Sequence, residues 1–196
     1  MEITYKILIL LNIFILIECT ASQNVPSSKN FMPLSVGNKW TYGSKSENVF
    51  EKQKIEFIKE IVDIDTIHNR SYFKMRNEYF GKDSISTFFY YQRISADTLF
   101  SLYYDSLSNS YLEIIEVIFS LKIGDTTCIY SREHLAEKCE EYIVVTNKTE
   151  NDFEILHDHI DMIDEEQWYT YKRGLGIVII RSSWGGTTEL LEYDFK

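Results

Sequence analysis

Apolar and polar residues alternate along short runs from residue 31 to the end of the chain, as they do in β-strands that bury one face. In residues 71–80, Phe73, Met75 and Tyr79 share one face, and charged residues occupy the other. The same period of two recurs in residues 111–119 and 189–195. Residues 177–180 are apolar at every position, which favours a strand covered on both faces.

Short polar breaks separate these runs at a spacing typical of antiparallel strands with local connections. They fall at residues 65–69, 81–84, 95–97, 105–110 and 147–152, and a Gly185-Gly186 pair marks a further hairpin turn. The pattern predicts one mainly β domain, a single antiparallel sheet of about eight to ten strands with at most one short helix. A curved open sheet and a partly closed barrel both fit this periodicity.

One segment departs from the strand pattern. In Ser131–Tyr142, Leu135, Cys139 and Tyr142 recur at helical spacing, and a long hairpin loop fits the same residues.

The amino-terminal segment predicts export. A basic start at Lys6, an apolar run over residues 7–17 and a small-residue exit describe a secretory signal peptide, here residues 1–21. The run is shorter than the approximately 20 residues that a transmembrane helix needs.

Two processing outcomes stay open at this exit. If residues 16–19 form a lipobox, Cys19 becomes a lipidated amino terminus, although Glu18 stands where bacterial lipoproteins have a small residue. If a signal peptidase cuts after Ala21 instead, a secreted or periplasmic protein begins at Ser22. In both cases residues 22–30 form a polar tether, and residues 31–196 form the domain.

The formal net charge of −10 argues against nucleic acid and against an anionic membrane surface as partners. The only membrane contact expected is therefore the lipid anchor.

Export also changes the meaning of the cysteines. Cys128 and Cys139 remain as a pair in an oxidising compartment, which predicts a structural disulfide. A bond that closes so short a loop contributes about 2–3 kcal/mol.

Both ends of the domain carry a recognisable sequence motif. Residues 31–42, which read Phe-Met-Pro-Leu-Ser-Val-Gly-Asn-Lys-Trp-Thr-Tyr, resemble the opening of uncharacterised exported proteins and lipoproteins of Bacteroidetes-type bacteria. Residues 171–178 resemble the Gly-x-Gly motif that begins their final hairpin. The resemblance implies a cell-envelope location and no particular activity.

The residues of these motifs have structural roles. We expect Gly37 to form a turn, Trp40 and Tyr42 to anchor the core, and Gly174 and Gly176 to flank a bend.

The most concentrated polar cluster follows residue 156. On a strand, His157 and His159 project from one face, so they could bind a transition metal together with Asp161. A solvated acidic loop with incidental histidines is the competing interpretation. No nucleophile elbow, zinc-protease motif or phosphate loop occurs, and the chain predicts no cofactor and no catalytic residue.

Residues 88–91 and 99–104 are aromatic or apolar on both faces. The leading interpretation is a non-catalytic, exported envelope protein that acts through binding or assembly with a protein partner. The alternative is a carrier with an aromatic-lined cavity for an apolar ligand such as a lipid. A metal-assisted hydrolase at His157 and His159 comes third.

Overall fold

The computed structural model describes residues 31–44, 54–106, 109–130, 139–159 and 165–196. Within these residues the chain forms twelve strands and no helix. They are β1 (Lys39–Ser44), β2 (Lys54–Ile67), β3 (Arg70–Phe80), β4 (Ile85–Ser95), β5 (Thr98–Asp105), β6 (Ser110–Ile118), β7 (Thr126–Tyr130), β8 (Glu141–Lys148), β9 (Asp152–His159), β10 (Gln167–Lys172), β11 (Gly176–Ser182) and β12 (Thr187–Asp194). The predicted class is confirmed, and the predicted number of eight to ten strands is wrong.

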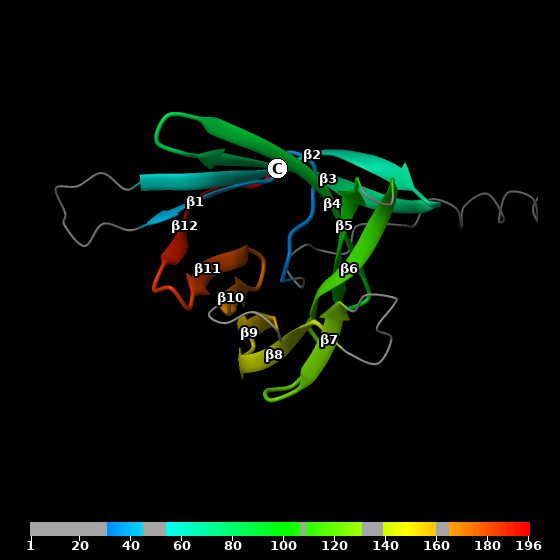
Figure 1. Cartoon of the computed structure of the whole chain (residues 1–196), viewed down its shortest axis with the longest axis vertical. Helices are drawn as coiled ribbons and strands as arrows, with labels where there is room; N and C mark the ends of the chain where they lie inside the picture. Colours follow the sequence, from blue (N-terminus) through cyan, green and yellow to red (C-terminus); the bar gives the residue numbers. More distant parts are fainter. Residues whose placement is uncertain (1–30, 45–53, 107–108, 131–138, 160–164) are drawn as a thin grey trace, which may run out of the picture.

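The twelve strands form one antiparallel sheet in which neighbours in the sheet are neighbours in sequence, with one exception. The exception is β1, which pairs with β12 and so joins the two ends of the domain. The strands β6 and β7 stand at the two ends of the hydrogen-bonded order. Figure 1 shows that the sheet curls until these two strands lie side by side, which makes a nearly closed barrel.

Bulges account for the curvature. The pairing register shifts in seven of the eleven strand pairs, among them β1–β2, β2–β3 and β1–β12. A bulge adds a residue to one strand and increases the local twist, so repeated bulges bend the sheet around its own inner face.

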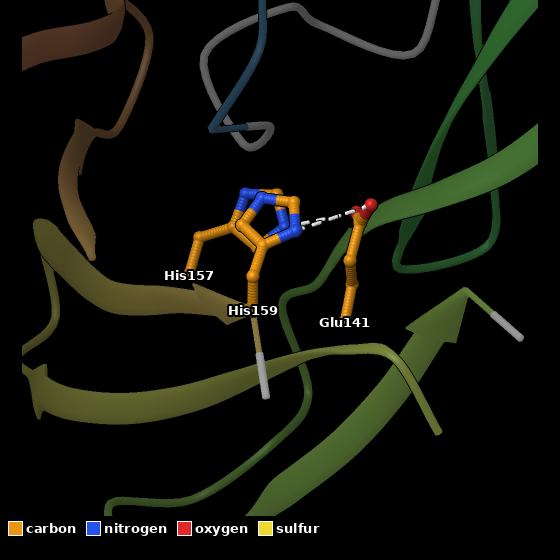
Figure 2. A group of neighbouring side chains, drawn as sticks. All are labelled: Glu141, His157 and His159. Atoms are coloured by element: carbon orange, nitrogen blue, oxygen red, sulfur yellow. Dashed lines mark ion pairs between the residues drawn. The ribbon is translucent and has the colours of Figure 1, made fainter. Parts of the chain in front are cut away.

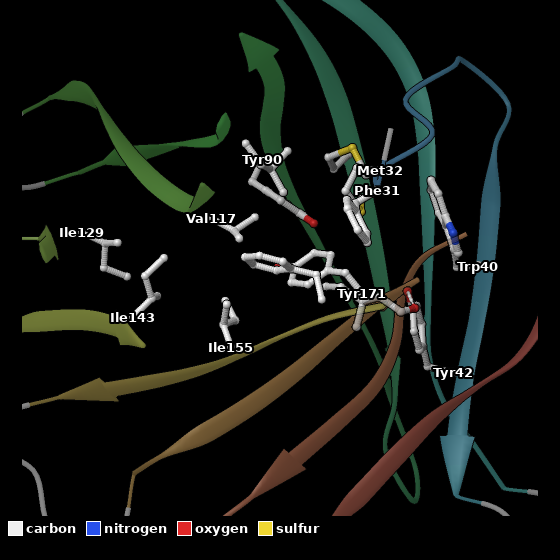
Figure 3. Close-up of a cluster of buried hydrophobic side chains, with 14 of the residues drawn as sticks. Phe31, Met32, Trp40, Tyr42, Tyr90, Val117, Ile129, Ile143, Ile155 and Tyr171 are labelled. Carbon is white, nitrogen blue, oxygen red and sulfur yellow. Dashed lines mark hydrogen bonds between the residues drawn. The ribbon is translucent and has the colours of Figure 1, made fainter. Parts of the chain in front are cut away.

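The inner face holds the core (Figure 3), a cluster of aromatic and aliphatic side chains. The largest fully buried members are Trp40, Tyr42, Phe153, Met32, Ile61 and Met75. Burial of each such side chain contributes about 1.5–3 kcal/mol. These side chains fill the part of the barrel interior around them, so this part holds no solvent channel.

The segment before β1 enters this core. The Phe31 ring lies 5.0 Å from the ring of Phe119, centroid to centroid, and the Arg173 guanidinium lies 4.7 Å from the centroid of the Phe31 ring. Buried Asn38 donates a hydrogen bond to the carbonyl of Pro33, at 2.8 Å, and accepts one from the backbone N–H of Lys196, at 3.0 Å. The first and last residues of the domain are thus tied together beside the β1–β12 pair.

The two motifs noted in the sequence, residues 31–42 and 171–178, contact each other. Trp40 Nε1 donates to the carbonyl of Leu175, at 2.6 Å, and the Tyr42 hydroxyl donates to the carbonyl of Ile177, at 2.9 Å. Both side chains are buried, as expected of core anchors. Of the three glycines, Gly37 has φ 90° and lies before β1. Gly174, in the turn between β10 and β11, and Gly176, the first residue of β11, also have positive φ.

Several expectations concern residues outside the described ranges: the signal peptide, Cys19, the tether and Asp161. Most of Ser131–Tyr142 is outside them too, and its last two residues belong to β8. No helix long and apolar enough to cross a membrane occurs in the part of the chain that the structure describes.

Candidate functional site

Cys128 and Cys139 form the predicted disulfide, with their Cα atoms 5.8 Å apart. Cys128 lies in β7, and Cys139 lies two residues before β8 begins at Glu141. The bond therefore connects β7, which ends the hydrogen-bonded order, to the start of the neighbouring strand.

A pocket of about 210 Å³ lies on the inner face of the sheet, and we call it the interior pocket. Side chains from β2 to β6 and from β10 and β11 line it, among them Lys59, Asn77, Phe88, Tyr90, Gln92, Tyr103, Glu116 and Tyr169. Two lining rings, those of Tyr79 and Phe88, are each 45% exposed, so the pocket opens to solvent beside them.

Stacked aromatic rings form part of the pocket wall. The ring centroids of Tyr90 and Tyr103 are 5.6 Å apart, with an angle of 8° between the ring planes. Phe88 stacks against both rings, at 5.6 Å and 6.2 Å. The cross-strand register causes this row, because aromatic residues alternate with outward residues on β4 and β5.

The same wall carries buried polar groups. Asn77 and Gln92 are only 6% and 4% exposed, and Asn77 Oδ1 and Gln92 Oε1 have no hydrogen-bond partner among the described residues. Both amide nitrogens are occupied: Asn77 Nδ2 donates to the Tyr79 hydroxyl, at 3.4 Å, and Gln92 Nε2 donates to Ser101 Oγ, at 3.2 Å. An unpaired buried acceptor costs about 1–3 kcal/mol, so a donor placed opposite these two atoms would stabilise the pocket.

Two charged side chains complete the pocket. The Lys59 ammonium lies 5.7 Å from the centroid of the Tyr90 ring, and Glu116 Oε1 accepts a hydrogen bond from the Tyr103 hydroxyl, at 3.0 Å. Burial, followed by the negative charge of Glu116, raises the pKa of Tyr90, Tyr103 and Tyr169 well above 10. These phenols therefore stay protonated at neutral pH and act as O–H donors.

The outer face of β4 to β6 also carries aromatic side chains, as the two-faced runs in the sequence predicted. Phe89 and Tyr104 are 51% and 57% exposed, and the Tyr111 ring packs edge-on against Tyr91 and Tyr104. The aromatic residues of these runs thus divide between the interior pocket and an exposed surface.

A second polar group on the inner face consists of Glu141, His157 and His159, which we call the histidine cluster (Figure 2). His159 is directly opposite Glu141 in the β8–β9 pair, and His157 is two residues along β9 on the same face. His157 Nε2 lies 3.3 Å from Glu141 Oε2, and His159 Nδ1 lies 3.4 Å from Glu141 Oε1. The two imidazole rings stack, with centroids 5.2 Å apart.

The structure thus brings together two of the three metal ligands predicted from the sequence. Asp161 lies outside the described residues, and Glu141, which the sequence reasoning missed, takes the third place. The signal that could have found Glu141 is the pairing of β8 with β9, which joins residues 18 positions apart.

No family model matches the chain. No curated protein matches it either. Among solved structures, the chain is similar to the crystal structure of a candidate lipoprotein from Parabacteroides distasonis ATCC 8503, at 12% identity and a TM-score of 0.46. The match covers 88% of this chain and 100% of the other. A similarity of this size carries no inference about function.

Proposed function

We propose that the protein is a non-catalytic binding protein of the cell envelope, exported and anchored through a lipid on Cys19. The interior pocket takes a small polyhydroxylated molecule of about the size of a monosaccharide. The observation that carries this proposal is the pair of buried acceptors without partners, Asn77 Oδ1 and Gln92 Oε1.

The chemistry of the wall selects the ligand class. Asn77 and Gln92 present acceptors, whereas Tyr90 and Lys59 present donors. The hydroxyls of Tyr103 and Tyr169 already donate to Glu116 and Gln167. A hydroxyl both donates and accepts, so one molecule with several hydroxyls can pair with all of these groups. The stacked rings suit the flat apolar face of a sugar ring.

The size of the pocket limits the ligand. At about 210 Å³ it is below the range of roughly 300–1,000 Å³ that holds drug-sized molecules. The polar wall also makes a lipid tail a poor occupant, because burying Asn77 and Gln92 against hydrocarbon leaves both acceptors unpaired. The lipid carrier is therefore the weaker of the two binding hypotheses.

The test measures the binding of named probes to the full chain by isothermal titration calorimetry. The probes are glucose, galactose and N-acetylglucosamine, with palmitate as the apolar comparison. We expect at least one sugar to bind and palmitate not to bind. Binding of palmitate alone, or of no probe sugar, would contradict the proposed ligand class.

A substitution then assigns binding to the pocket. We expect Asn77→Leu to weaken sugar binding about 3–10-fold, because one hydrogen bond of about 1 kcal/mol is lost. The same change leaves the free energy of unfolding unchanged or raises it, because an unpaired buried acceptor disappears. Glu78→Gln is the matched control, since Glu78 is the next residue on β3 and points to the other face. Equal affinity in Asn77→Leu and in this control would place the binding site elsewhere.

A further inference from the structure

We propose that Glu141, His157 and His159 bind a zinc ion. This proposal is independent of the sugar proposed for the interior pocket. One nitrogen of each ring and one carboxylate oxygen all lie within 4.8 Å of one another. Two imidazoles and a carboxylate are a donor set that zinc takes in proteins.

The distances fit a shared metal better than a simple ion pair. A charge-assisted N–H···O hydrogen bond has its heavy atoms about 2.7–2.9 Å apart. Each histidine nitrogen in the cluster lies further from its carboxylate oxygen, at 3.3 Å for His157 and 3.4 Å for His159. Two ligands bound to one tetrahedral zinc at about 2.0–2.1 Å are separated by about 3.3–3.4 Å. Each histidine nitrogen lies at this distance from the carboxylate oxygen that it faces.

An unpartnered nitrogen supports the same conclusion. His157 Nε2 is buried and makes no hydrogen bond to any described residue, although Glu141 Oε2 faces it. A buried ring nitrogen without a partner costs free energy, and a metal ion would occupy its lone pair.

The fold holds the three side chains in place. Glu141 and His159 are directly opposite each other in the β8–β9 pair. Two residues further along, on the same face, His157 is opposite Ile143, which is fully buried. The disulfide fixes the chain two residues before Glu141. This arrangement orders the ligands before the ion arrives, which lowers the entropic cost of binding.

The site is also accessible. The three side chains are 22–26% exposed, so an ion can reach them from solvent. The described ligands number three, which leaves one tetrahedral position for water or another donor.

The experiment uses the full, disulfide-bonded chain, freed of metal by chelation and dialysed against zinc chloride. We expect one zinc per chain by elemental analysis, and a rise in melting temperature with zinc, because the ion binds only the folded form. With cobalt(II) in place of zinc, we expect the strong visible absorption of a tetrahedral site.

Substitutions identify the ligands. We expect Glu141→Gln and His159→Asn each to weaken zinc binding by about 100-fold or more, since the loss of even an outer partner of a ligand costs 10–100-fold. The control is His68→Asn, which removes a histidine in the β2–β3 turn at φ 48°, a conformation that asparagine tolerates. Both ligand variants keep their folded circular dichroism spectrum in this expectation.

Three results would overturn the proposal. The first is less than stoichiometric zinc in the unchanged chain. The second is unchanged zinc affinity in folded Glu141→Gln. The third is an equal loss in His68→Asn, which would show unspecific binding to histidines.

Discussion

Gly174 lies in the turn between β10 and β11, Gly176 is the first residue of β11, and only Gly176 has a close neighbour where a Cβ would point. Gly174 has φ 75° and open space where a Cβ would point. Gly176 has φ 87°, and a Cβ there would lie 2.9 Å from Met32 Sδ and 3.4 Å from Trp40 Nε1. Since Met32 and Trp40 are buried, neither can move away easily.

Alanine substitutions separate the two effects. Gly174→Ala should lower the free energy of unfolding by about 1–2 kcal/mol, the cost of a side chain at positive φ. Gly176→Ala should lower it by about 1–3 kcal/mol more, because the methyl group overpacks the core. Urea unfolding of the two variants measures the difference. Equal losses would mean that Met32 yields without cost and that close packing does not explain Gly176.

For single residues, the sequence predicted which side chains are buried, but it did not predict which groups they contact. The alternation around Trp40 and Tyr42 indicated buried anchors, and both are buried. Their hydrogen-bond acceptors, the carbonyls of Leu175 and Ile177, lie 135 residues away in sequence. Periodicity describes which face a residue occupies, and it contains no information on what lies across the interior.

Among the strands, β7 is the one whose attachment to the sheet depends most on the Cys128–Cys139 disulfide. It has five residues, and among the described strands its only hydrogen-bonded neighbour is β8. The Cys128–Cys139 bond joins it to the residues that lead into β8.

Removing that bond should therefore act locally. We expect the double variant Cys128→Ser, Cys139→Ser to lose about 2–3 kcal/mol of stability, because the unfolded chain regains the freedom of the loop. Amide hydrogen exchange should accelerate in β7 and stay slow in β1, which is paired on both sides. Equal acceleration in both strands would show that the bond stabilises the whole sheet rather than one edge.

The elements also show where sequence reasoning fails. The runs at residues 71–80 and 111–119 correspond closely to β3 and β6, because alternation and polar turns agree there. The predicted number of strands is too low, and no run was singled out at the position of β7, which has only five residues. Glu141 was missed because its position opposite His159 follows from the pairing of β8 with β9, which periodicity does not give.

For the whole molecule, the proposed anchor sets the distance between domain and membrane. Residues 20–30 separate Cys19 from Phe31, which packs in the core. Fully extended, these residues reach at most ~40 Å, so an anchored domain stays near the lipid surface.

Mass spectrometry of the mature amino terminus tests the anchor. We expect Cys19 as the first residue, carrying a diacylglycerol adduct, and recovery of the protein with the membrane fraction. A Cys19→Ser variant should lose the adduct and leave that fraction. A mature chain that begins at Ser22 would instead mean release after cleavage, and it would contradict the anchor.

The pairing of β1 with β12 has a consequence for the order of events during biogenesis. Every other pair of neighbouring strands is consecutive in sequence, so it can form as soon as both strands have been synthesised. The β1–β12 pair can form only after the last residues of the chain have been synthesised. Until then the backbone groups of β1 on that side remain available to strands of other chains, a known route to aggregation. A premature stop before residue 187 would make this vulnerability permanent, so nascent chains have most need of a protecting chaperone just before their synthesis is complete.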